Sequence, residues 1–326
     1  MPKTRKPRSG SLQYWPRVRA NRPYARIRQW SSKVLTAGKP AGFAGFKAGM
    51  THVMLTDNRT NSKTKGMDIC VPVTIIECPP IKVMGVRFYK KDAYGKSAAM
   101  DVLAKLDKDV LRKVPKNNKT HTLPETTDGV VELRLLVHTK PSQTGIGQKK
   151  PAIFELAMGG SIDEQLAYAK EKLGKDITIQ DVFAEGDMLD IHSVTKGKGF
   201  QGPVKRFGVT LRNHKSEKVI RGPGNLGAWS PGHGNFYVAH AGQMGYHART
   251  ERNKHLLKIT PASESSSLAP QGGFLRYGIP KCDCILVKGS LPGTTKRLII
   301  LTTAERAKQH QAPSITLISR HSPQGR

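Results

Sequence analysis

Short runs of apolar and β-branched residues recur along the chain, and many of them alternate with polar residues. Runs of this kind predict β-strands. Turns rich in Gly, Pro and polar residues separate the runs, which is typical of a β-barrel or a sandwich. The pattern predicts strands over residues 43–55, 68–78, 81–89, 129–138, 187–195, 282–288, 296–302 and 314–319.

The period of the pattern changes between residues 90 and 185. Residues 97–107 place apolar side chains at helical spacing. Residues 161–173 give a stronger helical pattern, in which Ser161 and Glu164 form a capping box and a glycine ends the helix. We therefore expect an inserted α/β subdomain within a mainly β fold.

These patterns predict a β-barrel that is interrupted twice. We expect a basic N-terminal arm over residues 1–40 and the first part of the barrel over residues 41–89. The inserted α/β subdomain covers residues 90–185, and the second part of the barrel covers residues 186–326. A basic central loop over residues 196–258 extends from that second part.

The net charge favours a polyanionic partner. Fifty-four Lys and Arg against 24 Asp and Glu give a formal charge of +30. Nucleic acid is the first candidate, and an anionic membrane surface is the second. No apolar run approaches the roughly 20 residues of a spanning helix, and prolines and glycines interrupt every basic stretch, so a membrane is disfavoured. No apolar segment follows the basic N-terminus, and we expect a cytoplasmic protein.

The first basic stretch is residues 1–47. It holds twelve Lys or Arg and no acidic residue, with Tyr14, Trp15, Tyr24 and Trp30 between the charges. Its prolines prevent a long helix. One interpretation of this stretch is a disordered, solvated tail. Because guanidinium groups pair with phosphates and aromatic rings stack on bases, we favour an extended arm that follows a nucleic-acid backbone.

The second basic stretch is residues 193–258. It holds twelve Lys or Arg, five His, eleven Gly and only two acidic residues. Its few apolar residues do not offset the entropy of ordering so long a segment. We therefore expect a loop that a polyanion orders.

Three glycines within residues 197–202 match the spacing of the dinucleotide-binding fingerprint. That site needs a helix to begin directly after the glycines, and Pro203 with the residues that follow it does not predict one. We favour a grip on an RNA phosphate by backbone amides together with Lys196 and Lys198. A plain glycine-rich turn is the alternative.

Trp229 has Gly and Pro on both sides within residues 222–234. A core tryptophan is normally found in an apolar strand or helix. We therefore favour an exposed stacking residue at a loop tip over a buried one.

Candidate catalytic and metal-binding residues are sparse. Cys70, Cys78, Cys282 and Cys284 lack the spacing of a zinc half-site and predict small buried thiols. The five histidines of residues 193–258 lack the His-Glu-x-x-His spacing, and neither a nucleophile elbow nor a Walker motif is present. We expect no metal site and no enzyme. An RNA-modifying enzyme and a basic accessory protein that remodels nucleic acid are the alternatives.

Four motifs carry a family resemblance. They are GFKAGMTH at residues 45–52, VTKGKGFQGPVKRFG at 194–208, GAWSPGH at 227–233 and AGQMGYHART at 241–250. Together with the basic N-terminal block, they resemble the large-subunit ribosomal protein L3 family. The long arm and the tip sequence resemble its archaeal and eukaryotic branch, and the resemblance covers essentially the whole chain.

The resemblance implies a β-barrel of the type found in translation proteins, with an arm and a central loop that penetrate rRNA. It implies a structural constituent of the large ribosomal subunit that binds large-subunit rRNA, nucleates early assembly and is not an enzyme. The tip, which comprises Gly227, Ala228, Trp229 and Ser230, is then expected close to the peptidyl transferase centre. Neighbouring large-subunit proteins are the implied protein partners, tRNA and elongation factors are indirect ones, and no membrane is involved. No cofactor is implied beyond Mg2+ or K+ held by the bound rRNA.

The expected rRNA-binding residues have cationic, aromatic or amide side chains in the two basic stretches. Eukaryotic members have a histidine upstream of the tryptophan that can be methylated, and His214 is the nearest candidate, at a spacing longer by a few residues. The expected residues are Arg5, Lys6, Arg8, Trp15, Arg17, Arg19, Arg26, Arg28, Trp30, Lys196, Lys198, Lys205, Arg206, Arg212, His214, Lys215, Arg221, Trp229, His233, Gln243, His247, Arg249, Arg252 and Lys254.

Overall fold

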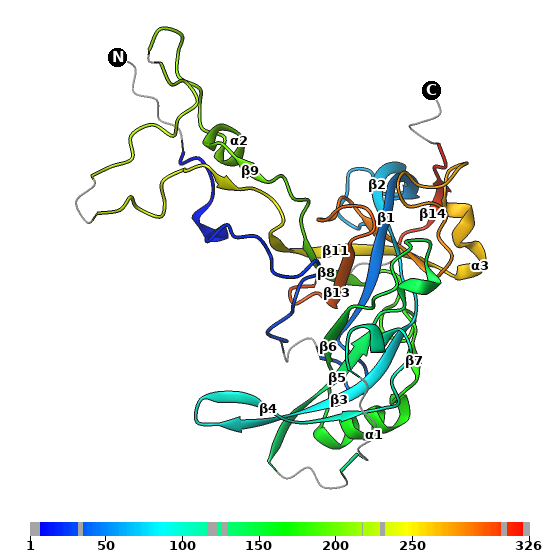
Figure 1. Cartoon of the computed structure of the whole chain (residues 1–326). Coiled ribbons are helices and arrows are strands. Elements are labelled where there is room, and N and C mark those ends of the chain that lie inside the picture. The colour runs from blue at the N-terminus through cyan, green and yellow to red at the C-terminus, as the bar shows by residue number, and fades with distance from the viewer. Residues whose placement is uncertain are drawn as a thin grey trace. The chain divides into compact units, whose positions relative to one another are not determined.

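A computed structural model describes residues 7–31, 35–115, 123–124, 129–216, 218–228, 232–307 and 312–321. The chain divides into two compact units, each built from two separated stretches of sequence (Figure 1). Unit 1 combines residues 1–22 with 194–248, and unit 2 combines residues 23–193 with 249–326.

A seven-stranded sheet forms a large part of unit 2. Its order is β13-β8-β11-β12-β2-β1-β14, and β1 also pairs with β13. This additional pairing closes the first six strands of that order into a ring, as expected for a barrel. The strands are β1 (Gly42–Thr56), β2 (Asp68–Glu77), β8 (Met188–Val194), β11 (Ala248–Thr260), β12 (Cys284–Lys288), β13 (Leu298–Thr303) and β14 (Ile315–Ile318).

The length of β1 explains its central place. Its 15 residues are enough to pair with β2 and with two further strands. Phe43 lies opposite Leu301 of β13, and Val53 lies opposite Ile318 of β14. At Gly45 a Cβ atom would approach the Glu77 carbonyl oxygen to 2.8 Å, so glycine permits this close packing of the strands.

A second sheet follows the order β4-β3-β5-β6, and β7 pairs with β3. The helix α1 (Ile162–Lys172) contacts β5. Buried residues from both sheets, such as Phe43 and Phe88, belong to one hydrophobic core. The strands of this sheet are β3 (Ile81–Asp92), β4 (Gly95–Leu103), β5 (Val130–His138), β6 (Ile153–Ala157) and β7 (Asp176–Ile177). Short helices also occur in unit 2: η3 (Val110–Arg112), η4 (Pro141–Gln143), α3 (Ala262–Ser265) and η5 (Ser266–Leu268).

The predicted capping box of α1 is confirmed. The Ser161 hydroxyl accepts a hydrogen bond from the Glu164 amide, and the Glu164 carboxylate accepts one from the Ser161 amide at 3.0 Å. Leu166 and Ala169 are buried, so the apolar face of this helix packs against the second sheet.

The helix predicted over residues 97–107 is wrong, because β4 occupies most of this range. A tight hairpin, in which Gly95 adopts φ +125°, holds β4 along β3 from its first residue. Val102 is buried, whereas Met100 is exposed. Cross-strand pairing outweighs so short a helical pattern.

Two predicted boundaries also differ from the structure. β3 belongs to the second sheet, so the first part of the barrel ends with β2 rather than at residue 89. Residues 248–258, expected in the central loop, form most of β11. Leu256 and Leu257 of this strand are buried in the core, which stabilises the strand without any polyanion.

Unit 1 has little regular structure in its described residues. It contains η1 (Leu12–Tyr14), β9 (Phe200–Gln201), α2 (Pro203–Phe207) and β10 (Gly242–Gln243). β9 and β10 pair antiparallel.

Candidate nucleic-acid interface

Unit 1 carries a strong positive charge. Its two segments, residues 1–22 and 194–248, contain fifteen Lys or Arg and a single acidic residue, Glu217. Charges of one sign repel each other in a folded unit unless a polyanion neutralises them. This imbalance makes unit 1 the first candidate for a nucleic-acid interface.

Aromatic rings join the arm to the central loop. Trp15 stacks on Phe207 with ring centroids 5.7 Å apart, and it meets Phe236 edge-on at 6.1 Å. Phe207 is buried. Gly10 permits this packing, because a Cβ atom there would collide with the Phe207 ring. Two segments that are far apart in the sequence therefore pack against each other.

A short helix positions Phe207. α2 begins with Pro203, whose missing N–H is tolerated at that position, and Gly208 ends the helix at φ +71°. The expectation that no helix begins at Pro203 is therefore wrong. Yet α2 has five residues, and the preceding strand β9 pairs only with an antiparallel partner. The described residues of unit 1 therefore lack the parallel strand–helix unit of a dinucleotide site.

Hydrogen bonds tie the arm to the end of the loop. The Ala20 amide donates to the Tyr246 carbonyl oxygen at 2.8 Å. His247 Nδ1 donates to the Val18 carbonyl oxygen at 2.9 Å, and the His247 amide donates to the Thr195 hydroxyl at 3.1 Å. His247 is 8% exposed, so this residue of the expected RNA surface lies inside the unit.

Two guanidinium groups lie on the Phe207 ring. The Arg17 Cζ atom is 4.4 Å from the ring centroid, and the Arg206 Cζ atom is 5.0 Å from it. Arg206 also donates to the carbonyl oxygens of Gln243 and His240, both at 2.9 Å. Arg206 thus holds the two limbs of the loop together.

The positive charges of Arg8, Arg17 and Arg206 act on one another. Burial, and then the charge of Arg8, lower the pKa of Arg17; burial, and then the charge of Arg17, lower the pKa of Arg206. Among the described residues, no carboxylate forms an ion pair with any of the three. A phosphate group placed here would relieve this repulsion.

The other predicted residues of unit 1 differ in exposure. Arg212 and Gln243 are half-buried, and Gln243 Nε2 donates to the Gly245 carbonyl oxygen at 2.9 Å. The exposed ones are Arg8, Arg19, Lys196, Lys198, Lys205, His214, Lys215, Arg221 and His233, together with Gly227 and Ala228 of the tip. Arg5, Lys6, Trp229 and Ser230 lie outside the described residues.

The predicted residues of unit 2 include two exposed cations, Arg26 and Arg28. Trp30 and Arg249 are half-buried, and Trp30 packs against the hydrophobic core. Trp30 therefore fixes the chain to the barrel, and Arg26 and Arg28 precede this anchor.

Two cations of β11 have acidic partners within the protein. Arg252 Nη1 lies 2.5 Å from a Glu305 carboxylate oxygen, and Lys254 Nζ lies 2.6 Å from one of Glu251. Both were expected to bind RNA. These ion pairs compete with a phosphate, so the two side chains are weaker candidates than the lysines of unit 1.

Three aromatic residues of this interface, Phe207, Phe236 and Tyr237, were not predicted from the sequence. Tyr237 contributes its carbonyl oxygen, which accepts a hydrogen bond from Arg8. The available signal was the presence of aromatic residues in a glycine-rich stretch, where few other residues can form a local core. The Pro and Gly that bracket residues 203–208 were a second signal, because they are typical of helix ends.

The four cysteines differ in exposure. Cys78 and Cys284 are buried as expected, whereas Cys70 is exposed and Cys282 is partly exposed. Burial raises the pKa of the Cys282 thiol to about 12, which disfavours the thiolate that binds metals. Within the described ranges, no group of three His, Cys, Asp or Glu side chains could hold a metal ion. In the same ranges, no helix is long and apolar enough to cross a bilayer.

Comparisons with known proteins agree on one family. The family model described as "Ribosomal protein L3" matches residues 1–325. The chain is 44% identical to the "Large ribosomal subunit protein uL3" of Methanothermobacter thermautotrophicus and 46% identical to that of Methanosphaera stadtmanae, with both chains covered completely in each case. It is 44% identical to the protein of the same name from Archaeoglobus fulgidus, over 99% of this chain and all of the relative.

Proposed function

The chain belongs to the ribosomal protein L3 family, and on this premise we propose that it is a structural constituent of the large ribosomal subunit that binds large-subunit rRNA through unit 1. The resemblance noted in the four sequence motifs is confirmed by the family match over residues 1–325. The relatives have the name of a ribosomal protein and not that of an enzyme. Neighbouring ribosomal proteins are the protein partners that this name implies.

One observation carries the proposal for the interface. Unit 1 packs Arg8, Arg17 and Arg206 near a shared aromatic cluster with a single acidic residue in its two segments. Such a unit gains free energy when phosphates replace its counterions, because the released ions gain entropy. The Lys198 amide donates to the Met244 carbonyl oxygen at 2.9 Å, so the exposed lysine side chains of the loop, rather than this amide, are the further donors for phosphate oxygens.

The hydrogen bonds and ring stacking within unit 1 give this interface a defined shape. The arm is held to the loop at Ala20 and at Trp15, so the two segments present their charges together. A preformed surface loses less conformational entropy on binding than two independent tails do. This supports recognition of one folded RNA site rather than general attraction to nucleic acid.

The tip of the loop is proposed to approach the peptidyl transferase centre, and the protein to act early in assembly. Gly227 and Ala228 are exposed, and Gly227 adopts φ +83°, a turn that favours glycine. Trp229, which follows them, would insert against a base. Effects on tRNA and elongation factors would pass through the rRNA that the tip contacts.

Co-sedimentation tests this function against that of a general nucleic-acid-remodelling protein. Cells that express the tagged chain are lysed, and the large subunits are isolated and washed at high salt. The molar ratio of bound chain to large subunit is then measured. We expect one chain per large subunit after the wash. Loss of the chain in the wash, together with equal affinity of the purified chain for unrelated DNA and RNA, would support the remodelling protein instead.

A further inference from the structure

The last strand of the barrel sheet has an open edge. β14 pairs with β1, and no other strand of the described residues pairs with it. Unpaired N–H and C=O groups on an edge strand can accept an additional strand from another chain.

The register shows which groups are available. The Ser319 amide donates to the His52 carbonyl oxygen at 3.0 Å, so these two residues form a hydrogen-bonded pair. Because such pairs alternate along an antiparallel ladder, the backbone groups of Leu317 face β1 and those of Ile318 face the open edge. A peptide laid along β14 would find the Ile318 amide and carbonyl in place.

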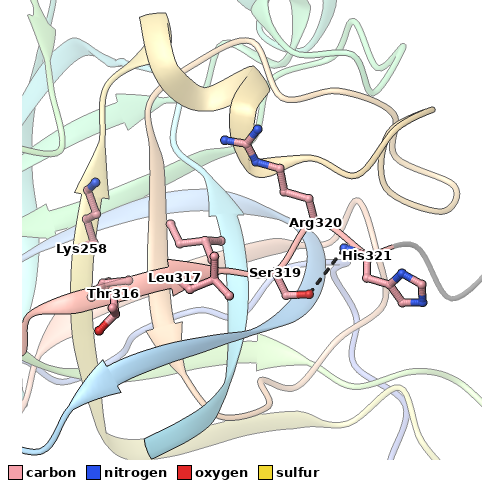
Figure 2. A pocket seen from close by; sticks show the side chains of 8 residues that line it. Lys258, Thr316, Leu317, Ser319, Arg320 and His321 are labelled. Atoms are coloured by element: carbon pink, nitrogen blue, oxygen red, sulfur yellow. Dashed lines mark hydrogen bonds between the residues drawn. The ribbon is translucent and has the colours of Figure 1, made fainter. Parts of the chain in front are cut away.

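The side chains beside this edge are apolar and cationic. They line a shallow hollow of about 670 Å3 formed by Lys258 of β11 and by residues 315–321. Leu317 is 61% exposed. Figure 2 shows its side chain with Lys258 on one side and Arg320 on the other. None of the residues that line the hollow is acidic, and no acidic side chain of the described residues pairs with Lys258 or Arg320.

The charge is unequal along the strand. At the N-terminal end of β14, the Thr316 hydroxyl donates to the Asp68 carboxylate at 3.4 Å, so an acidic residue lies near that end. At its other end, Arg320 and His321 follow Ser319, whose hydroxyl accepts a hydrogen bond from the His321 amide at 3.4 Å (Figure 2). An added strand would therefore favour acidic residues near Arg320.

We propose that the open edge of β14 binds an extended acidic segment of another protein, by addition of a strand. The backbone groups of Ile318 would pair with the segment, Leu317 would contact one of its apolar side chains, and Lys258 and Arg320 would pair with its carboxylates. RNA is the less suitable occupant. Phosphates would use the cations, but they would leave the exposed leucine and the open backbone edge without a partner.

A pair of synthetic peptides tests the proposal with the purified full-length chain. One peptide alternates valine with glutamate, and the other alternates valine with lysine. We expect the acidic peptide to bind in fluorescence anisotropy and to slow hydrogen exchange of the amides of residues 315–321. We expect Arg320→Glu to weaken that binding by roughly tenfold, because a repulsive charge pair replaces an attractive one.

A matched control separates this site from the general positive charge of the protein. Lys91 is exposed on β3, and Lys91→Glu changes the net charge by the same amount as Arg320→Glu. The proposal requires that Lys91→Glu leave peptide binding within about twofold of wild type. Equal effects of the two variants, or exchange protection elsewhere in the chain, would overturn the proposal.

A second variant and a second probe complete the test. Leu317→Asp should abolish acidic-peptide binding without unfolding the chain, because this side chain is mostly exposed. A single-stranded RNA probe should bind Arg320→Glu and Lys91→Glu with equal affinity. A selective loss of RNA affinity in Arg320→Glu would show that the hollow is an RNA contact, and the proposal would be wrong.

Discussion

The indole ring of Trp15 lies on the phenyl ring of Phe207, with centroids 5.7 Å apart and ring planes at 22°. The first residue belongs to the N-terminal arm and the second to the central loop. Their contact means that the two basic segments fold as one unit, which presents a combined cationic surface. It also means that Trp15 already has an aromatic partner within the protein.

Replacement of Trp15 tests this coupling. Trp15→Ala removes a ring stack that contributes about 0.5–1.5 kcal/mol beyond its buried area, so the arm should separate from the loop. We expect faster proteolytic cleavage within residues 7–22 and an unchanged unfolding temperature of unit 2, while Trp15→Phe keeps most of the protection. An arm that is cleaved equally fast in wild type and Trp15→Ala would contradict the coupling.

Replacement of Trp229 tests whether this residue is an exposed stacking residue at the loop tip. Because Gly and Pro surround it in the sequence, Trp229→Ala should leave the thermal stability of the free chain nearly unchanged. Subunits that contain the variant should show slower assembly or weaker tRNA binding. A loss of roughly 3–5 kcal/mol in the free chain, as for a core aromatic residue, would show that Trp229 is buried and not a stacking tip.

Replacement of Tyr277 tests how much its hydrogen bond to the buried Glu77 carboxylate stabilises the barrel. Glu77 is fully buried, and it accepts hydrogen bonds from the Tyr277 hydroxyl and from the amides of Lys281 and Cys282, at 2.6 and 2.9 Å for the amides. Burial and the Glu77 charge raise the pKa of Tyr277, so its hydroxyl stays a donor. Tyr277→Phe should lower the free energy of unfolding by about 1–3 kcal/mol.

Chemical denaturation measures this difference. Tyr94→Phe is the matched control, because Tyr94 is fully exposed and should lose almost nothing. Equal unfolding free energies for Tyr277→Phe and Tyr94→Phe would mean that the buried hydrogen bond does not stabilise the fold.

The lowered pKa of Asp57 predicts that the stability of the fold depends on pH. Hydrogen bonds from Arg59, and then from Ser62 and Thr64, hold the pKa of its carboxyl well below the usual range. A lowered pKa stabilises the fold above the unfolded-state value of about 3.9, and this contribution is lost as the pH falls further towards the folded-state value. Asp57→Asn should therefore lower the melting temperature at pH 7, with a difference that shrinks below about pH 4.

Thermal unfolding between pH 7 and pH 3 checks this prediction. Asp92→Asn, at an exposed aspartate, serves as the control variant. A difference between wild type and Asp57→Asn that stays constant over the whole range would show that the carboxylate charge is not what orders this turn.

The strands could be predicted from the sequence because alternation is a local property. The range of β2 and the capping box of α1 are examples. β4 could not be predicted, because its conformation depends on pairing with β3 rather than on its own apolar spacing. The same limit applies to β11, whose Leu256 and Leu257 reveal their burial only once the barrel has formed around them.

The positive charge of the interface could also be predicted, because it is a sum over the sequence. The sequence alone could not predict which of these cations are available to bind phosphate. Arg252 pairs with Glu305, which is distant in the chain, and Arg206 holds the carbonyl oxygens of the opposite limb of the loop. Only the fold reveals such partners, so the exposed lysines are better candidates for phosphate contacts than Arg252, and Arg206 contributes its charge as part of the cluster with Arg8 and Arg17.

If unit 1 is the rRNA interface, its exposed lysines contact rRNA phosphates. Each lost phosphate contact lowers the slope of log affinity against log salt by about 0.7–0.9. Replacing Lys196, Lys198 and Lys205 with glutamine should therefore reduce the slope for a large-subunit rRNA fragment by roughly two. The control replaces Lys63, Lys65 and Lys91, three exposed lysines of unit 2, in the same way.

Filter binding of the two triple variants and the wild type, from low to high salt, is the most direct measurement. We expect the unit 1 variant to show the smaller slope and the unit 2 variant to follow the wild type. Equal slopes for the two variants would contradict the claim that unit 1 is the rRNA interface.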